Sequence, residues 1–196
     1  TIEWYSDAAG TNLLATGNSF TTPNLSATTT YYAQSKSSGG LITMGPSSPT
    51  AQGGALASEN EILFFNFGVT TVTDLLSIDV FPLVAGQAGA ITVRNSVNTI
   101  VGSYAFTTSA SGGTTAQTIP LGVNLIPGSY ILSFDAVPAG GFIINADDAS
   151  YPYSSSVAVL TGNSFDNTFY MYAYNWKFPN ICRSLLTPVV ATITPA

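Results

Sequence analysis

Residues 129–134 read Ser-Tyr-Ile-Leu-Ser-Phe, so that Tyr130, Leu132 and Phe134 share one face of an extended chain. Because successive side chains of a β-strand point to opposite faces, this period of two predicts a half-buried strand. The same alternation occurs over residues 90–94, which read Ala-Ile-Thr-Val-Arg. No window of about 11 residues carries a sustained helical period, so the sequence predicts an all-β chain.

Similar short runs of Thr, Val, Ile and aromatic residues fill the rest of the sequence, and clusters of Gly, Pro, Asn and Ser separate them. Closely spaced strands with such turn residues are typical of an antiparallel sandwich or barrel. The 196 residues are enough for one large domain or two small ones. We therefore predict an all-β fold built on antiparallel β-sandwiches.

The composition excludes several classes of function, because the chain has no histidine, one cysteine and four lysine or arginine residues. Without histidine, neither a Ser-His-Asp or Cys-His catalytic group nor a His-ligated metal can form. A single cysteine cannot make an internal disulfide. Four basic residues are too few to neutralise the phosphates of a nucleic acid. We expect no catalytic residue, no cofactor and no nucleic-acid partner.

The apolar content does not indicate a membrane protein, although the mean hydropathy is +0.31. A spanning helix needs about 20 predominantly apolar residues in a row. The longest uncharged stretch, residues 95–134, is interrupted throughout by Thr, Ser, Gly and Pro. We therefore expect no membrane insertion.

The composition changes over residues 35–54, which are rich in Ser, Gly and Pro and poor in large apolar side chains. Such a stretch is typical of a linker or a long loop. A second junction falls at Pro179-Asn180. The sequence thus predicts four parts: a first part at 1–36, a linker at 37–54, a β-domain at 55–178 and a closing strand at 181–196.

Four short motifs follow one another near the start of the chain: Trp-Tyr at 4–5, Leu-Leu-Ala-Thr-Gly at 13–17, Phe-Thr-Thr-Pro at 20–23 and Thr-Thr-Tyr-Tyr at 29–32. Their order resembles the second half of an Ig-like repeat of secreted, multi-repeat surface and adhesin proteins of the Bacteroidota. In that family a strand of the form C-x-S-x-x-T-P-V-x-A-T-V closely follows T-T-Y-Y. Residues 182–193 resemble this strand.

The resemblance implies that a second β-domain is inserted between two neighbouring Ig strands. Residues 29–34 should then pair with residues 187–194 in one sheet. The upstream half of the Ig-like sandwich is expected outside this sequence, and the open edges it leaves invite pairing with a neighbouring chain. Cys182 has two alternatives: a disulfide to another molecule or to a segment outside this sequence, and simple burial.

The middle of the chain resembles, less specifically, a jelly-roll-like β-sandwich found in the same surface proteins. The matching features lie at residues 78–82, 91–93, 126–130, 151–153 and 170–177. Many carbohydrate-binding modules share this architecture, but a fold alone does not determine a function.

The densest aromatic pattern lies at residues 169–178. Read with a period of two, Tyr170, Tyr172, Tyr174 and Trp176 share one face. Aromatic faces stack on sugar rings, and tyrosine adds a hydroxyl for hydrogen bonds, so this stripe is a candidate glycan-binding platform. The alternative is a strand buried in the core or in a subunit contact.

A second candidate ligand site combines Asn145, Asp147 and Asp148 with Tyr151 and Tyr153. Clustered carboxylate and amide oxygens suit Ca²⁺, with Asp147 and Asp148 as its weak candidates, and they also suit sugar hydroxyls. The alternative is a solvated Asx turn. No spacing of acids selects a pair for glycoside hydrolysis.

These features together predict a non-enzymatic, extracellular module of a large bacterial cell-surface protein, acting as a filament, stalk or adhesin repeat. Its partners would be neighbouring repeats or subunits of the same assembly, since little like-charge repulsion opposes association. The alternative is a carbohydrate-binding module of a secreted glycan-degrading system, with glycans as partners.

Overall fold

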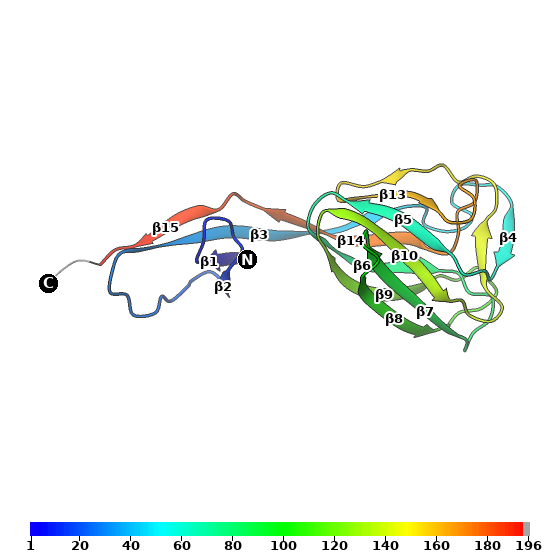
Figure 1. Ribbon diagram of the computed structural model, residues 1–196, viewed down its shortest axis with the longest axis horizontal. Helices are drawn as coiled ribbons and strands as arrows, with labels where there is room; N and C mark the ends of the chain where they lie inside the picture. The colour runs from blue at the N-terminus through cyan, green and yellow to red at the C-terminus, as the bar shows by residue number, and fades with distance from the viewer. Residues whose placement is uncertain (194–196) are drawn as a thin grey trace. The chain divides into compact units, whose positions relative to one another are not determined.

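The computed structural model describes residues 1–193, and every regular element in this range is a β-strand (Figure 1). Neighbouring strands run antiparallel, which confirms the predicted fold class. No helix among the described residues is long and apolar enough to cross a membrane. The chain divides into two compact units: unit 1 comprises Thr1–Gly40 and the chain from Asn180 onward, and unit 2 comprises Leu41–Pro179.

Unit 1 is a single antiparallel sheet in which β2, β1 and β3 lie in that order and β15 pairs with the other side of β3. Two strands, β3 and β14, contribute residues to both units. The strands with residues in unit 1 are β1 (Ile2–Tyr5), β2 (Leu13–Thr16), β3 (Thr29–Met44), β14 (Tyr174–Arg183) and β15 (Thr187–Ala191).

A small aromatic cluster covers one face of this sheet. The ring of Trp4 stacks on Phe20 with 5.8 Å between centroids, and Phe20 meets Tyr31 edge-on at 5.1 Å. The indole N–H of Trp4 donates to the carbonyl of Gly17 at 3.0 Å, which fixes the loop that carries Phe20. Aromatic pairs of this kind add about 0.5–1.5 kcal/mol beyond their burial.

A charged cluster fastens the strands of unit 1 around the buried carboxylate of Glu3. The carboxylate accepts a hydrogen bond from the Tyr5 hydroxyl at 2.8 Å and pairs with Lys36 at 3.1 Å and Arg183 at 3.3 Å. Burial alone would raise the pKa of Glu3, but the hydrogen bonds from these three partners outweigh it and the pKa lies below its ordinary value. The cluster therefore ties β1 to β3 and β14.

The pairing predicted between the two distant segments of unit 1 is present. Val189 lies opposite Tyr31, and Ala191 lies opposite Thr29, in an antiparallel register. This result confirms the predicted adjacency over the described residues. The expected closing strand at 181–196 also included residues 194–196, which lie outside the described range.

Unit 2 contains two larger sheets and one pair of short strands. One sheet has the order β12-β13-β5-β10-β7-β8, the other contains β14, β6 and β9 in that order, and β11 pairs with β4. The remaining strands are β4 (Leu56–Glu59), β5 (Phe64–Val69), β6 (Thr73–Val80), β7 (Ala88–Asn95), β8 (Ile100–Thr107), β9 (Gln117–Leu125), β10 (Gly128–Ala136), β11 (Phe142–Asn145), β12 (Tyr153–Ser154) and β13 (Ala158–Asn163).

The core of unit 2 is made by the inward faces of its sheets. Tyr130, Leu132 and Phe134 of β10 are all buried, as the alternation of that run predicts. Full burial of one such side chain contributes about 1.5–3 kcal/mol, so this core dominates the stability of the unit. Its largest fully buried aromatic side chains are Phe65, Phe67, Phe134, Phe142, Tyr170, Tyr172, Tyr174, Trp176 and Phe178.

The segment expected as a linker, residues 37–54, begins instead as a strand, because β3 continues to Met44. Ile42 is half-buried and Met44 is fully buried in the core of unit 2, whereas Leu41 is exposed. The Ser- and Gly-rich composition hid this short alternation. Only the rest of the segment is irregular.

Candidate functional site

The aromatic stripe does not form a surface platform. Tyr170, Tyr172, Tyr174 and Trp176 are all 0% exposed. Their rings pack inside unit 2, where Trp176 lies 5.1 Å from Phe67 between ring centroids. No face of these four side chains is open to a ligand, so the glycan-binding interpretation of this stripe is corrected to a core role.

The local backbone explains why the period of two failed here. The strand begins only at Tyr174, so Tyr170 and Tyr172 lie in an irregular segment. The Tyr170 hydroxyl and the Trp176 indole N–H both donate to the carbonyl of Ala173 at 2.8 Å. Within β14 the alternation of buried and partly buried residues holds, but in the irregular segment before it Met171 and Ala173 are buried as fully as Tyr170 and Tyr172. Both sides of the sequence pattern can therefore face the core.

Tyr151 and Tyr153 pack against the outside of the same aromatic cluster. The Tyr151 ring stacks on Tyr170 with 5.7 Å between centroids, and the Tyr153 ring meets Tyr170 edge-on at 5.2 Å. The Tyr153 hydroxyl bonds with the side-chain amide of Gln52. Burial raises the pKa of Tyr151 well above its ordinary value, so its hydroxyl stays protonated. These two residues act as packing partners rather than as a free binding surface.

Asn145 holds the irregular segment that follows β3. It is 1% exposed, and its amide donates to the carbonyls of Pro49 at 3.2 Å and Gly53 at 2.6 Å. Its side-chain oxygen accepts a hydrogen bond from the backbone of Asp148, and Asp147 accepts one from the backbone of Ala55. The cluster predicted as a ligand site thus makes intramolecular contacts. No group of three or more His, Cys, Asp or Glu side chains suited to a metal ion occurs among residues 1–193.

Cys182 is exposed near the end of β14 and is not in a disulfide in this chain, which holds no second cysteine. A disulfide to another molecule or to a segment outside this sequence remains a prediction.

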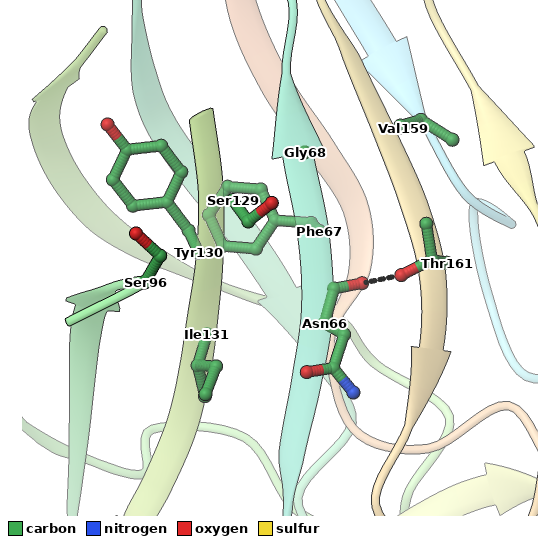
Figure 2. A pocket seen from close by; sticks show the side chains of 9 residues that line it. All are labelled: Asn66, Phe67, Gly68, Ser96, Ser129, Tyr130, Ile131, Val159 and Thr161. Carbon is green, nitrogen blue, oxygen red and sulfur yellow. Dashed lines mark hydrogen bonds between the residues drawn. The ribbon is translucent and has the colours of Figure 1, made fainter. Parts of the chain in front are cut away.

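A hollow lies on the outward face of the six-stranded sheet of unit 2 (Figure 2). Its volume is about 450 Å³, and it opens over β13, β5 and β10. The inward neighbours on these strands, such as Phe67 and Tyr130, belong to the core. The lining residues are Asn66, Phe67, Gly68, Ser96, Ser129, Tyr130, Ile131, Val159 and Thr161.

A glycine creates this hollow. In the sheet Gly68 lies between Ser129 of β10 and Val159 of β13, so the middle of the row has no side chain. A Cβ atom at this position would come within 3.3 Å of Val159, and φ lies outside the left-handed region, so the backbone itself does not require glycine. A glycine inside a strand pattern marks a close approach or a site. The glycine was visible in the sequence, but it was not singled out there as a candidate site residue. Nothing in the sequence indicated that Ser129 and Val159 lie beside it.

A second hollow of about 260 Å³ adjoins the first, since both are lined by Ser96, Ser129 and Tyr130. It extends over the turn between β9 and β10, where Ile126 is exposed. We call the two hollows together the sheet-face groove. Its additional lining residues are Asn95, Val101, Asn124, Ile126, Pro127 and Gly128.

The sheet-face groove is neutral and offers several free polar groups. Within the described part of the chain, no charged side chain lines either hollow. The amide of Asn66 and the hydroxyls of Ser96 and Ser129 make no hydrogen bond to any described residue. The hydroxyl of Thr161, by contrast, donates to the carbonyl of Asn66 at 2.9 Å (Figure 2).

The second distinctive surface is the pair of open edges of unit 1. On β2, Leu13 and Leu14 are exposed, and on β15, Val189 and Val190 are exposed. Each of these strands has a partner on one side in the described sheet. Neither strand carries a charged residue. Edges of this kind can accept a further strand.

Residues 1–45 match a family model described as an Ig-like domain, CHU_C associated. The matched range covers β1, β2 and β3. It includes all of Thr1–Gly40, the first segment of unit 1, and extends five residues into unit 2. No curated protein matches the chain. The match supports an Ig-like module of a non-catalytic, structural or adhesive type, typical of secreted surface proteins.

Proposed function

We propose that this chain is a non-enzymatic module of a large bacterial cell-surface protein, where it serves outside the cell as a filament, stalk or adhesin repeat. The match of residues 1–45 to an Ig-like family supports the structural or adhesive type. The secreted multi-repeat proteins of the Bacteroidota, which the sequence resembles, supply the proposed setting.

The observation that carries this proposal is the open-edged sheet of unit 1. Natural proteins normally protect edge strands with charged side chains, bulges or a covering loop, because unpaired N–H and C=O groups attract other strands. Pro188 removes one N–H from β15, but exposed Val189 and Val190 flank the unpaired side without any charge. Such an edge suits a strand of a neighbouring repeat, which would add to the sheet through backbone hydrogen bonds.

The surface chemistry favours the same use. Charged residues make up 7% of the chain, so few like charges would oppose contact between neighbouring modules. Stability in arrays of repeats comes partly from interfaces between neighbours. An isolated unit 1 would therefore gain stability when a neighbour covers its edges.

We also propose that unit 2 is a jelly-roll-like sandwich inserted between two strands of an Ig-like unit. The pairing of β15 with β3 supports this proposal, because these strands are neighbours in the sheet although all of unit 2 separates them in the sequence. Insertions are tolerated where the chain ends of the inserted domain leave the host strands paired.

Sedimentation of the full chain over a range of concentrations tests the edge-pairing proposal. We expect reversible association of the wild-type chain, and we expect Val190→Lys to weaken it at least tenfold because a lysine on an edge strand opposes strand addition. The matched control is Val97→Lys, which places the same charge at another exposed valine in the turn between β7 and β8.

The control variant should associate like the wild-type chain. A wild-type chain that remains monomeric at every concentration would contradict the proposal. Equal weakening by both substitutions would also contradict it, because the effect would then come from net charge rather than from the β15 edge.

A further inference from the structure

We propose that the sheet-face groove of unit 2 is a binding site for a neutral oligosaccharide. This inference does not depend on the edges of unit 1, since every lining residue belongs to unit 2. It also differs from the sugar platform predicted from the sequence, because the groove is formed by other strands and by none of the buried tyrosines at 170–174.

The chemistry of the lining matches the surface of a sugar chain. Sugars alternate hydroxyl groups, which need hydrogen-bond partners, with apolar C–H faces. The groove supplies the first through the amide of Asn66 and the hydroxyls of Ser96 and Ser129, and the second through Ile131 and Val159 (Figure 2). Sites that combine apolar walls with a few polar groups are typical of small-ligand binding.

The absence of charge from the lining selects a neutral ligand. A charged ligand would lose hydration in the groove without gaining an opposite charge, which is unfavourable. The nearest ion pair on the same face joins Arg94 to Asp135 at 3.2 Å, so each of these charges already has a partner. Arg94 lies opposite Ile131 in the sheet, at the border of the groove.

The shape of the groove favours a sugar chain over a peptide. A peptide strand binds a sheet by pairing with an edge, where backbone donors and acceptors are free. The groove lies instead on the face of three strands that are already paired with one another, β13, β5 and β10. The two hollows adjoin at Ser96, Ser129 and Tyr130, so together they can contact more than one sugar unit of a chain.

The affinity should be modest, because the groove is shallow and contains no exposed aromatic ring; Tyr130 is 6% exposed. We expect a dissociation constant on the order of 1 mM. A measurement by NMR is suited to this range. The full chain labelled with ¹⁵N would be titrated with cellohexaose, laminarihexaose, xylohexaose, mannohexaose and maltohexaose, each up to about 10 mM.

We expect at least one of these neutral probes to shift the amide signals of Asn66, Gly68 and Ser129. Gly68→Val should weaken that binding at least tenfold, because the valine side chain fills the floor of the groove. Valine also has a high preference for β-strands, so the strand should be kept. Asn66→Ala, which removes an amide and leaves the floor open, should weaken it about threefold or more. Ser103→Val, at an exposed serine of β8 in the same sheet, is the matched control and should bind like the wild-type chain.

Three results would overturn the proposal: no shift with any neutral probe, shifts confined to residues outside the groove, and unchanged affinity in both Gly68→Val and Asn66→Ala. Binding restricted to a charged oligosaccharide, such as tetragalacturonate, or to an extended peptide would likewise overturn it, because the neutral lining argues against the first and the paired strands against the second.

Discussion

Unit 1 and unit 2 are both antiparallel β-structures, but they bury their side chains in very different ways. Unit 2 places Trp176 and Phe65 at 0% exposure between two sheets. Unit 1 is one sheet whose aromatic cluster, around Trp4, Phe20 and Tyr31, is partly open, and whose strands are tied by the ions around Glu3. The difference indicates that unit 2 has its own core, whereas unit 1 is held by a small aromatic cluster and one charged cluster and has two strand edges without a partner among residues 1–193.

The comparison also separates the two proposed roles. A self-contained sandwich can present a rigid groove on its outer face, since the strands beneath it are fixed by the core. A sheet with open edges suits assembly, since pairing adds the contacts that it lacks.

Trp176→Ala should give the largest loss of stability. Removing a large aromatic side chain from a packed core costs about 3–5 kcal/mol, and here it also removes the hydrogen bond to Ala173. Native-state hydrogen exchange should report the loss in β5 and β10. The matched variant is Trp4→Ala, whose half-buried ring should cost less and should affect β1 and β3 instead. If either variant destabilised both units equally, the two units would unfold together, which would contradict the separate core assigned to unit 2.

Asn145→Ala should cost about 1–3 kcal/mol, because it leaves the buried carbonyl of Pro49 and the partly buried carbonyl of Gly53 without this donor. The loss should appear as faster hydrogen exchange at Ala55 and its neighbours, with unit 1 unchanged. Asn124→Ala, at an exposed amide that bonds to Asp74, is the matched control and should have little effect. Similar losses from both variants would contradict the structural role assigned to Asn145.

Glu3→Gln should destabilise unit 1 by about 1–2 kcal/mol near neutral pH and leave unit 2 unchanged. The pKa of Glu3 is lowered in the folded chain, so its ionised form stabilises unit 1 above the ordinary value near 4.5, and this stabilisation is lost as the pH falls through the lowered pKa. Unfolding of unit 1 followed against pH should therefore show an acid-induced loss that the variant lacks.

Asp7→Asn is the control for this pH dependence. Hydrogen bonds from the backbone of Thr11 and Asn12 lower the pKa of Asp7 as well, but its carboxylate lies at an exposed turn. This variant should keep the part of the acid-induced loss that belongs to Glu3. A Glu3→Gln chain with the full wild-type dependence on pH would contradict the assignment.

Val190→Lys should change the stability of an isolated chain least, by about 0.5 kcal/mol or less, because Val190 is exposed. Its effect on association should be large, as proposed above. Thermal unfolding at low concentration measures the first quantity separately from the second. A loss of several kcal/mol at low concentration would show that β15 is needed within the chain rather than between chains.

The sequence predicted the regular parts of the structure well. Where one side of a strand is buried and the other is exposed, as in residues 129–134, the period of two is visible and the strand is correct. The family resemblance predicted that residues 29–34 pair with 187–194, and the pairing is present over 29–33 and 187–191. No local pattern links segments so far apart.

The candidate sites could not be predicted in the same way. Tyr170 and Tyr172 fit a strand pattern, but they lie in an irregular segment before β14, and Met171 and Ala173 between and beside them enter the core as well. Gly68 gains its importance only from its cross-strand neighbours, Ser129 and Val159. Register between distant strands depends on the whole fold, so a single sequence reveals the glycine but not the groove around it.

Hydrogen exchange measured at low and high protein concentration tests whether the open edges of unit 1 pair between chains. We expect the backbone amides of β15 and β2 that face away from their paired strands to exchange rapidly in the dilute full chain and to become protected as the concentration rises, while those of β5 and β10 stay protected throughout. Unchanged exchange at both edges of unit 1 over the whole range, or new protection confined to unit 2, would contradict this expectation.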